Sequence, residues 1–245
     1  MDTKALQFAS RFSLPPNSLG YCGKDSAPEK FKSCVIDRKC VGVSKELKEF
    51  IVLHPYLKTL SEIIGQDTFS YKVVEAYWLG NNELKKVKAK DYEILLKNFK
   101  KQGVPSWLIE ELSQKPPKVF IPTHLFQILH VGVGRASGSV PYNLKSINNC
   151  MIRWGKVKKI VDGKVIVRLN SLKKVKGKYK LVVKEEKLLV VPGFTPKLKV
   201  DDVVCAHWGQ ITKILDKREI KKLVYWTREV LKNFSKQEKL SSYST

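Results

Sequence analysis

Cys150 and His207 are the two residues whose chemistry is easiest to read from the sequence. Cys150 opens a predicted strand that continues as Met-Ile-Arg-Trp-Gly, and His207 lies near the end of a predicted strand over residues 203–208. In a small β-barrel the first strand and a late strand can be neighbours, so these side chains are expected to meet. A thiolate and an imidazole together suit iron, zinc or copper, and the thiolate can hold a low-valent metal. The pair predicts a metal site, against the simpler alternative of a buried cysteine and a packed histidine.

A second group of residues is spread over the first 130 positions. Gly20 and Gly23 flank a Tyr-Cys pair and favour a tight turn that presents a thiol. The alternative interpretation is that the aromatic and thiol side chains of this group only pack in the core and that its carboxylate lies on a solvated helix face. The two histidines are six residues apart and reach one metal only if the chain bends between them. The residues predicted to form this second site or pocket are Tyr21, Cys22, Glu75, Tyr77, Asn81, His124 and His130.

The cysteine count argues against a scaffold of disulfides. Five cysteines are present, at positions 22, 34, 40, 150 and 205, and no two of them form a Cys-x-x-Cys pair. An odd number with these spacings suits neither a disulfide framework nor a structural zinc site. We therefore expect reduced thiols.

The elements that must position these residues fall into two halves, which predict an α+β fold. Apolar residues recur at helical spacing over 44–64, 70–79, 91–103 and 105–112, so residues 1–135 are predicted to form a helical domain. A Gly-, Ser- and Asn-rich linker is predicted over 136–149. Short β-branched segments then predict a small OB-like β-barrel that ends in a helix, over residues 150–235, and a disordered tail over 236–245.

Three local signals support the second half of this scheme. Asp162-Gly163 between β-branched arms predicts a hairpin, and Lys176-Gly177 predicts another turn. Asp216 followed three residues later by Glu219 predicts a capping box at the start of the last helix.

Positive charge dominates the composition. Lys and Arg number 46 against 23 Asp and Glu, for a formal net charge of +23. Such a surface attracts nucleic acid, although a Lys-rich solvated surface is the simpler explanation. The nucleic-acid alternative would use aromatic side chains of Tyr179, Trp154 and Trp208 for stacking and a lysine cluster for phosphates, namely Lys173, Lys174, Lys176, Lys178 and Lys180.

Several classes of protein are not indicated by the sequence. It contains no Walker loop, no Gly-x-Ser-x-Gly elbow and no His-Glu-x-x-His motif. No apolar run is long enough for a membrane span, and the first residues lack a secretory signal, so no membrane partner and a cytoplasmic location are expected. A cysteine-dependent enzyme, with Cys22 or Cys150 as nucleophile and a histidine as base, remains a third alternative.

Two ungapped motifs give the C-terminal half a resemblance to a known family. The first runs from Cys150 through Gly155 to Val157, and the second contains Asp202, Val203, His207, Gly209, Leu215, Asp216 and Glu219. Residues 150–234 resemble the HypC/HupF family, small chaperones of [NiFe]-hydrogenase maturation. Two departures are evident, because that family's cysteine is N-terminal whereas Cys150 is internal, and Trp154 replaces a proline.

This resemblance implies a function and a site. It implies an accessory protein or metallochaperone in which Cys150 holds an iron ion carrying cyanide and carbonyl, with His207 as a second ligand. The implied partners are a maturation scaffold and a hydrogenase large-subunit precursor. The N-terminal half resembles an uncharacterised prokaryotic family through the Gly-Tyr-Cys-Gly motif at 20–23 and Val-Glu-Ala-Tyr-Trp-Leu-Gly-Asn at 74–81.

Overall fold

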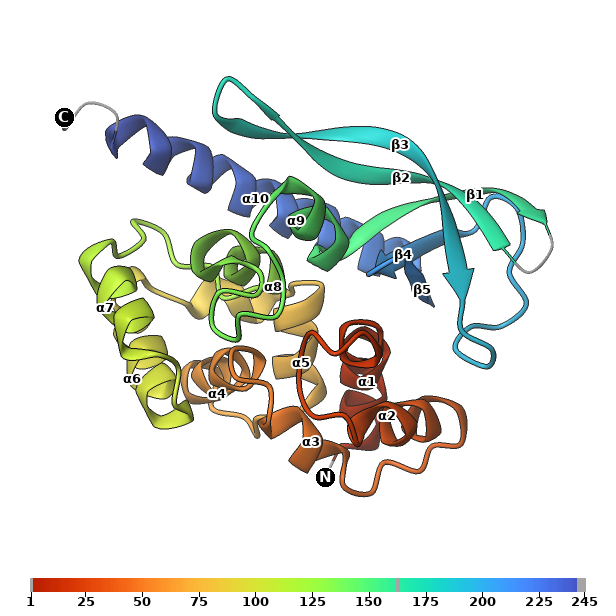
Figure 1. Cartoon of the computed structure of the whole chain (residues 1–245), viewed down its shortest axis with the longest axis horizontal. Helices are drawn as coiled ribbons and strands as arrows, with labels where there is room; N and C mark the ends of the chain where they lie inside the picture. Colours follow the sequence, from red (N-terminus) through yellow and green to blue (C-terminus); the bar gives the residue numbers. More distant parts are fainter. Residues whose placement is uncertain (1, 162–163, 242–245) are drawn as a thin grey trace.

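A computed structural model of the chain describes residues 2–161 and 164–241, with side chains described as far as Phe234. The first 150 residues are helical and lie on one side of a sheet that carries the rest of the chain (Figure 1). Helices α1 to α5 are Thr3–Ser18, Ala27–Ile36, Val43–Lys48, Leu53–Ile64 and Tyr71–Trp78. They are followed by η1 (Asn82–Lys86), η2 (Ala89–Asp91), α6 (Tyr92–Gln102), α7 (Ser106–Gln114), α8 (His124–Gln127), a π-helical turn η3 (Ile128–Gly132) and α9 (Leu144–Cys150).

The helices predicted near residues 70–79, 91–103 and 105–112 are confirmed by α5, α6 and α7. The single helix predicted over 44–64 is wrong, because the chain breaks between α3 and α4. The break turns Phe50 inward, where its ring lies 6.0 Å from that of Phe31 and is 5% exposed. Burial of a large aromatic side chain outweighs the few hydrogen bonds that a continuous helix would add.

The sheet contains the strands β1 (Arg153–Val161), β2 (Lys164–Val175), β3 (Lys178–Val190), β4 (Val203–His207) and β5 (Gln210–Ile214). They hydrogen-bond in the order β1-β2-β3-β5-β4, and β4 also pairs with β1. Arg153 lies opposite Ala206 and Trp154 opposite Cys205, so the expected contact between the first and a late strand is confirmed. The β1–β2 approach requires Gly155, because a Cβ there would lie 2.1 Å from the carbonyl oxygen of Arg168.

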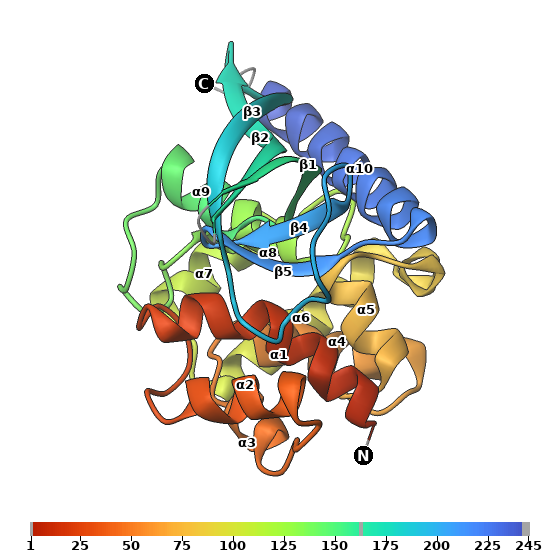
Figure 2. The same ribbon diagram turned by 90° about the vertical axis from the view of Figure 1, so that its right-hand side faces the viewer.

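The last helix, α10 (Lys217–Ser241), packs along the sheet and the helical half (Figure 2). Its predicted capping box is confirmed: Glu219 N donates to Asp216 Oδ1 at 2.8 Å, and Asp216 N donates to Glu219 Oε2 at 3.1 Å. The helix continues to Ser241, so it extends into the segment predicted as a disordered tail. Residues 242–245 and the predicted Asp162-Gly163 turn lie outside the described residues.

Two expectations from the sequence are corrected. Cys150 does not open a strand but is the last residue of α9, and α9 includes residues 144–149 of the predicted linker. Asn143 caps this helix by accepting from Lys145 N and Ser146 N. The expectation that all thiols are reduced is also wrong, since Cys34 and Cys40 form a disulfide across the loop that follows α2. Their Cα atoms lie 4.3 Å apart, a proximity that spacing alone could not reveal.

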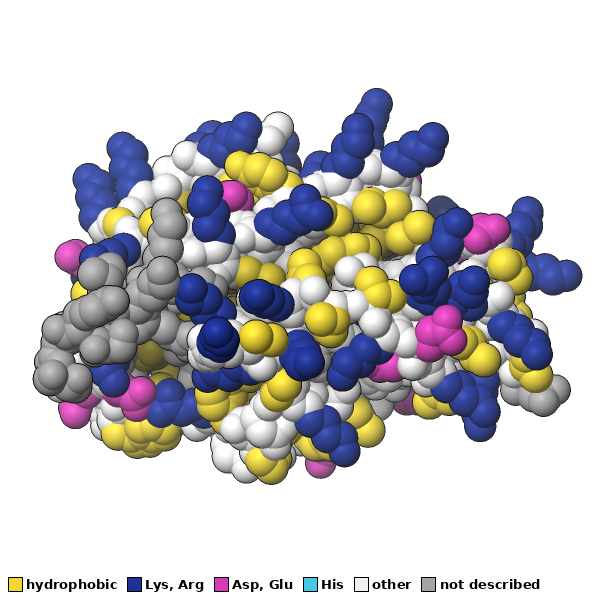
Figure 3. Space-filling model, turned by 90° about the horizontal axis from the view of Figure 1, so that it is seen from above, with side chains coloured by type: hydrophobic (Ala, Val, Ile, Leu, Met, Phe, Trp, Pro, Cys, Tyr) yellow, Lys and Arg dark blue, Asp and Glu magenta, His cyan; other side chains and the backbone are white. Residues whose placement is uncertain are grey.

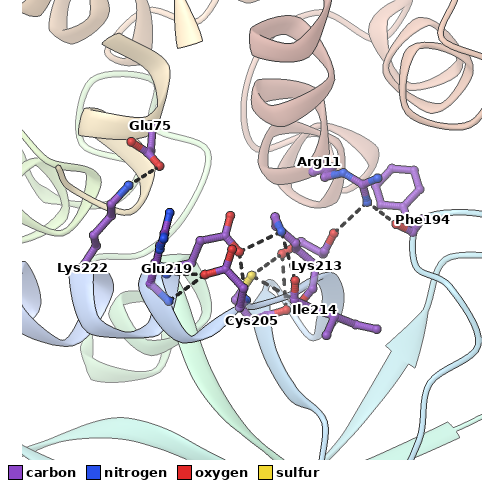
Figure 4. Close-up of polar contacts among 11 residues, drawn as sticks. Arg11, Glu75, Phe194, Cys205, Lys213, Ile214, Glu219 and Lys222 are labelled. Carbon is purple, nitrogen blue, oxygen red and sulfur yellow. Dashed lines mark hydrogen bonds and ion pairs between the residues drawn. The ribbon is translucent and has the colours of Figure 1, made fainter. Parts of the chain in front are cut away.

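The two halves share one hydrophobic core and a set of polar contacts. Arg11 of α1 donates to the carbonyl oxygens of Phe194 and Thr212, and Lys222 of α10 pairs with Glu75 of α5 at 2.7 Å (Figure 4). Apolar side chains from α1 and α5 belong to the same buried cluster as those from β4 and α10. None of the described helices has an apolar stretch long enough to cross a bilayer.

Candidate metal centre

His207 is held at the end of β4 by an unusual turn. Trp208 and Gly209, which connect β4 to β5, both have positive φ, at 48° and 75°. Positive φ is strained for a bulky residue such as tryptophan, so packing must hold it there. The Nδ1 atom of His207 lies 2.6 Å from the carbonyl oxygen of Phe12 in α1. Since a carbonyl only accepts, Nδ1 carries the proton and Nε2 presents a lone pair.

Nε2 of His207 has no hydrogen-bond partner among the described residues, although the side chain is 1% exposed, and the indole nitrogens of Trp78 and Trp208 in the same cavity wall are also without one. Buried polar atoms are almost always paired, and an orphan one calls for an explanation. Histidines that bind metals are usually neutral: one ring nitrogen donates a hydrogen bond, often to a carbonyl oxygen, and the other is free to bind the metal.

Cys150 approaches His207 because the end of α9 is joined to the β4–β5 turn. Trp208 N donates to the carbonyl oxygen of Asn149 at 2.7 Å, which brings the adjacent Cys150 side chain beside His207. Cys150 is 7% exposed and is not part of a disulfide. A free, buried thiol therefore lies next to an unpaired imidazole nitrogen.

His124 enters the same cluster from the helical half. It begins α8, where Thr123 caps the helix by accepting from Phe126 N. Its Nε2 lies 2.9 Å from the carbonyl oxygen of Cys150 and 3.7 Å from Cys150 Sγ. Ligand atoms of His124, Cys150 and His207 all lie within 4.8 Å of one another, which is close enough for one metal ion to contact all three.

The Tyr77 hydroxyl is the partner of His124 Nδ1, at 2.7 Å, and also contacts Gln127 Oε1. Because the Cys150 carbonyl oxygen only accepts, Nε2 of His124 carries the proton in this structure and Nδ1 accepts from Tyr77. Metal binding through Nε2 would place the proton on Nδ1, which would donate to Tyr77, and the Tyr77 hydroxyl would then donate to Gln127 Oε1. Such outer hydrogen bonds orient metal-bound histidines and raise their basicity.

A cavity of about 380 Å³ opens onto the three residues. Its walls come from both halves and include Tyr21 and Cys22 on the loop after α1, Trp78 at the end of α5, and Trp208. The Trp78 ring centroid lies 4.6 Å from that of His124 and 5.9 Å from that of His207. Aromatic side chains thus line the cavity next to the three potential ligand residues, all of which are buried.

Burial sets the protonation of the cluster. It lowers the pKa of His207 to about 4 and the pKa of His124 well below its ordinary value, with the His207 charge adding to the effect on His124. Burial likewise raises the pKa of the Cys150 thiol well above its usual range. Both imidazoles are therefore neutral at pH 7, as metal ligands must be, whereas the thiol loses its proton when a cation binds.

The other predicted site residues fall into two groups. Tyr21, Cys22 and Tyr77 line the cavity together with the metal cluster. Glu75 and Asn81 lie elsewhere: Glu75 pairs with Lys222 and accepts from Asn81 Nδ2 at 3.0 Å, so both stabilise the contact with α10. The side chains that were grouped by sequence thus divide between a cavity and an interface.

His130 is separated from His124 by the π-helical turn. Its Nε2 lies 2.8 Å from the Tyr92 hydroxyl, and its ring packs on Phe126 and Phe234. The bend therefore does not bring the two histidines to one ion. His124 pairs instead with residues 26 and 83 positions later, a combination that no spacing rule indicates, although its place at a helix start after Thr123 marks it as a fixed side chain.

The lysines of the nucleic-acid alternative lie on the β2–β3 ribbon. Lys173 faces Lys180 across the strands, and Lys174 Nζ lies 5.6 Å from the Tyr179 ring centroid. Figure 3 shows Lys and Arg side chains spread over this face with hydrophobic side chains between them. Trp154 is only 7% exposed, and Trp208 packs on Tyr21 at 4.6 Å between ring centroids. The Trp154 indole is therefore buried, whereas Trp208 is half-buried.

Comparison with known proteins gives the family. The chain belongs to a family of unknown function (DUF6390), whose model matches residues 2–241. No curated protein and no solved structure matches the chain. Membership is consistent with the expected relation to an uncharacterised family and assigns no activity.

Proposed function

We propose that this protein is a metal-binding accessory protein whose His124, Cys150 and His207 hold a soft transition-metal ion, with iron as the first candidate. The observation that carries the proposal is the buried, unpaired Nε2 of His207, whose tautomer Phe12 fixes for ligation. Two imidazoles and a thiolate favour iron, zinc or copper over magnesium or calcium, which prefer oxygen ligands.

The geometry of the cavity favours an ion with an open position. Three protein ligands leave at least one coordination position of a tetrahedral ion unfilled, and the cavity lies where such a position would open. The cavity wall contains one carboxylate, Glu49, which pairs with Lys24 at 3.0 Å. Among the described lining residues there is thus no unpaired carboxylate to serve as a general base, which favours binding and delivery of a metal group over hydrolysis at it.

The more specific proposal rests on the resemblance of residues 150–234 to the HypC/HupF chaperones. By that resemblance the ion is iron with cyanide and carbonyl ligands, the sheet is a small OB-like barrel, and the partners are a maturation scaffold and a hydrogenase large-subunit precursor. His124 is a third ligand contributed by the helical half, which would hold the ion more enclosed than two ligands can.

The two alternatives have less support from the described residues. Nucleic-acid binding loses its stacking platform at Trp154, although the lysine ribbon remains exposed. A cysteine nucleophile at Cys150 would need a base to remove its proton, and burial lowers the pKa of both neighbouring imidazoles.

Metal analysis of anaerobically purified protein tests the proposal. We expect the wild type to carry about one ion per chain and Cys150→Ala to lose it while its circular dichroism stays unchanged. Cys205→Ala is the matched control, because Cys205 is also a buried free thiol but does not line the cavity. Unchanged metal in Cys150→Ala contradicts the proposal. Infrared bands of metal-bound cyanide and carbonyl would support the iron carrier, and their absence from metal-loaded protein would contradict that part alone.

A further inference from the structure

A second thiol, Cys22, lies in the wall of the same cavity as the proposed metal ligands. It is an exposed cysteine on the loop between α1 and α2, whereas Cys150 is 7% exposed and belongs to the α9 end. Both residues line the same cavity of about 380 Å³. Cys34 and Cys40 form a disulfide, and the Cys205 thiol is hydrogen-bonded to Thr212, so none of these three sulfur atoms is free to bind a ligand in the cavity.

The loop that carries Cys22 is held in a defined position. Asn17 Nδ2 donates to the carbonyl oxygens of Cys22 and Lys24, at 2.7 and 2.9 Å. Gly23 has a φ of 76°, and a Cβ there would lie 2.5 Å from the Phe50 ring, so only glycine permits this packing. Ser139 Oγ donates to the Tyr21 carbonyl oxygen at 2.9 Å, which ties the loop to the chain leading into α9. The thiol is therefore presented to the cavity by several independent contacts.

The cluster of His124, Cys150 and His207 does not include Cys22, and its three residues are buried. The three inner ligand atoms lie within 4.8 Å of one another, and Cys22 is not a member of that group. His124 and His207 are 5% and 1% exposed, and the unpaired Nε2 of His207 marks where a ligand must bind.

We propose that Cys22 is the entry ligand of this centre: it takes the metal ion first and passes it to Cys150 and the two imidazoles by ligand exchange. This inference rests on the proposed metal site. As the ion binds Cys22, a metal–sulfur bond forms and the thiol proton goes to solvent. A bond to Cys150 then forms with loss of its proton, the bond to Cys22 breaks, and Cys22 takes up a proton. The ion keeps its oxidation state throughout.

The test follows Co²⁺ transfer to the metal-free full-length protein from a Co²⁺–nitrilotriacetate complex, by stopped-flow absorbance at the thiolate-to-cobalt band. We expect Cys22→Ser to reach the same final intensity as the wild type but several-fold more slowly. Cys205→Ser, the matched control, should keep both the rate and the intensity of the wild type.

Different results would overturn the role of Cys22 and the metal site itself. A wild-type rate in Cys22→Ser overturns the inference, and so does a lower final intensity, which would make Cys22 a permanent ligand. If the wild type develops no thiolate-to-cobalt band, or Cys150→Ser keeps it, the proposed metal site itself fails. Circular dichroism of each variant shows that the fold is retained.

Discussion

Two regions of the contact between the halves differ in how their buried polar groups are paired. In the region of Figure 4, Cys205 Sγ lies 3.3 Å from Thr212 Oγ1, and Glu75 is paired with Lys222. In the cavity, His207 donates through one nitrogen and leaves the other without a partner. Both regions join helices to β4 or α10, but the groups named in the first are paired, whereas Nε2 of His207 is not. The first region therefore stabilises the contact between the halves, and the second is where we propose that a metal ion binds.

Two histidines of one short segment, the buried His124 and the half-buried His130, differ in a similar way. His130 is enclosed by the rings of Tyr92, Phe126 and Phe234, and its pKa is lowered to about 4 by burial. His124 is 5% exposed, and its Nε2 lies 2.9 Å from the Cys150 carbonyl oxygen and 3.7 Å from the Cys150 sulfur, in one cluster with His207. Burial alone therefore does not mark a ligand; the neighbours of the nitrogen do.

Acid should destabilise the metal-free protein most strongly through the imidazoles of the centre. Because the folded-state pKa of His207 is about 4, below the ordinary value of 6.5, the unfolded chain binds more protons as the pH falls. The stabilising contribution is complete above about pH 6.5 and is lost as the pH falls toward 4. From pH 7 to 5 we expect a loss of about 2 kcal/mol in the free energy of unfolding from His207 alone.

Urea unfolding in the presence of a chelator, at pH 7 and pH 5, measures this loss. His207→Gln should lose less stability over the same interval than the wild type does. An equal loss in both proteins would show that His207 is not kept neutral in the folded state.

Removal of the Tyr77 hydroxyl should weaken metal binding, whereas removal of a neighbouring hydroxyl outside the centre should not. Tyr77→Phe leaves His124 without the Nδ1 partner that orients it, so metal affinity should fall about 10- to 100-fold. Tyr56→Phe is the matched control, because Tyr56 is equally buried, its ring lies 6.0 Å from that of Tyr77, and its hydroxyl has no partner among the described residues. Competition titration with a Co²⁺ chelator measures both affinities. Similar values for the two variants would contradict the role of Tyr77.

Disruption of the Glu75–Lys222 ion pair should lower the stability of the fold and leave metal affinity unchanged. Lys222→Met leaves the buried Glu75 carboxylate without its cation, so the free energy of unfolding should fall by about 1–2 kcal/mol. Lys221→Met, on the exposed side of α10, should change it by less than about 0.5 kcal/mol. Chemical unfolding gives both values, and metal affinity should match the wild type in each. A loss of affinity in Lys222→Met would show that the two regions are coupled.

Local patterns predicted much of the fold. Helical spacing located α5, α6 and α7, and the Asp216–Glu219 capping box marked the start of α10, because such signals act within one or two turns. The break between α3 and α4 was not predictable, since it depends on Phe50 reaching Phe31. The Cys34–Cys40 disulfide escaped prediction for a similar reason, because the loop geometry that joins them is not encoded in their spacing.

The sequence by itself determined the residue types of the candidate centre and predicted that Cys150 and His207 meet, although Cys150 ends α9 and does not open a strand as expected. Only the tertiary structure decided that His124 is the third member, that Cys22 shares the cavity, and that Glu75 and Asn81 belong to the interface. The physical reason is that hydrogen-bonded pairing of neighbouring strands follows from periodic side chains, whereas the approach of a helix start to a strand end depends on how the whole core packs.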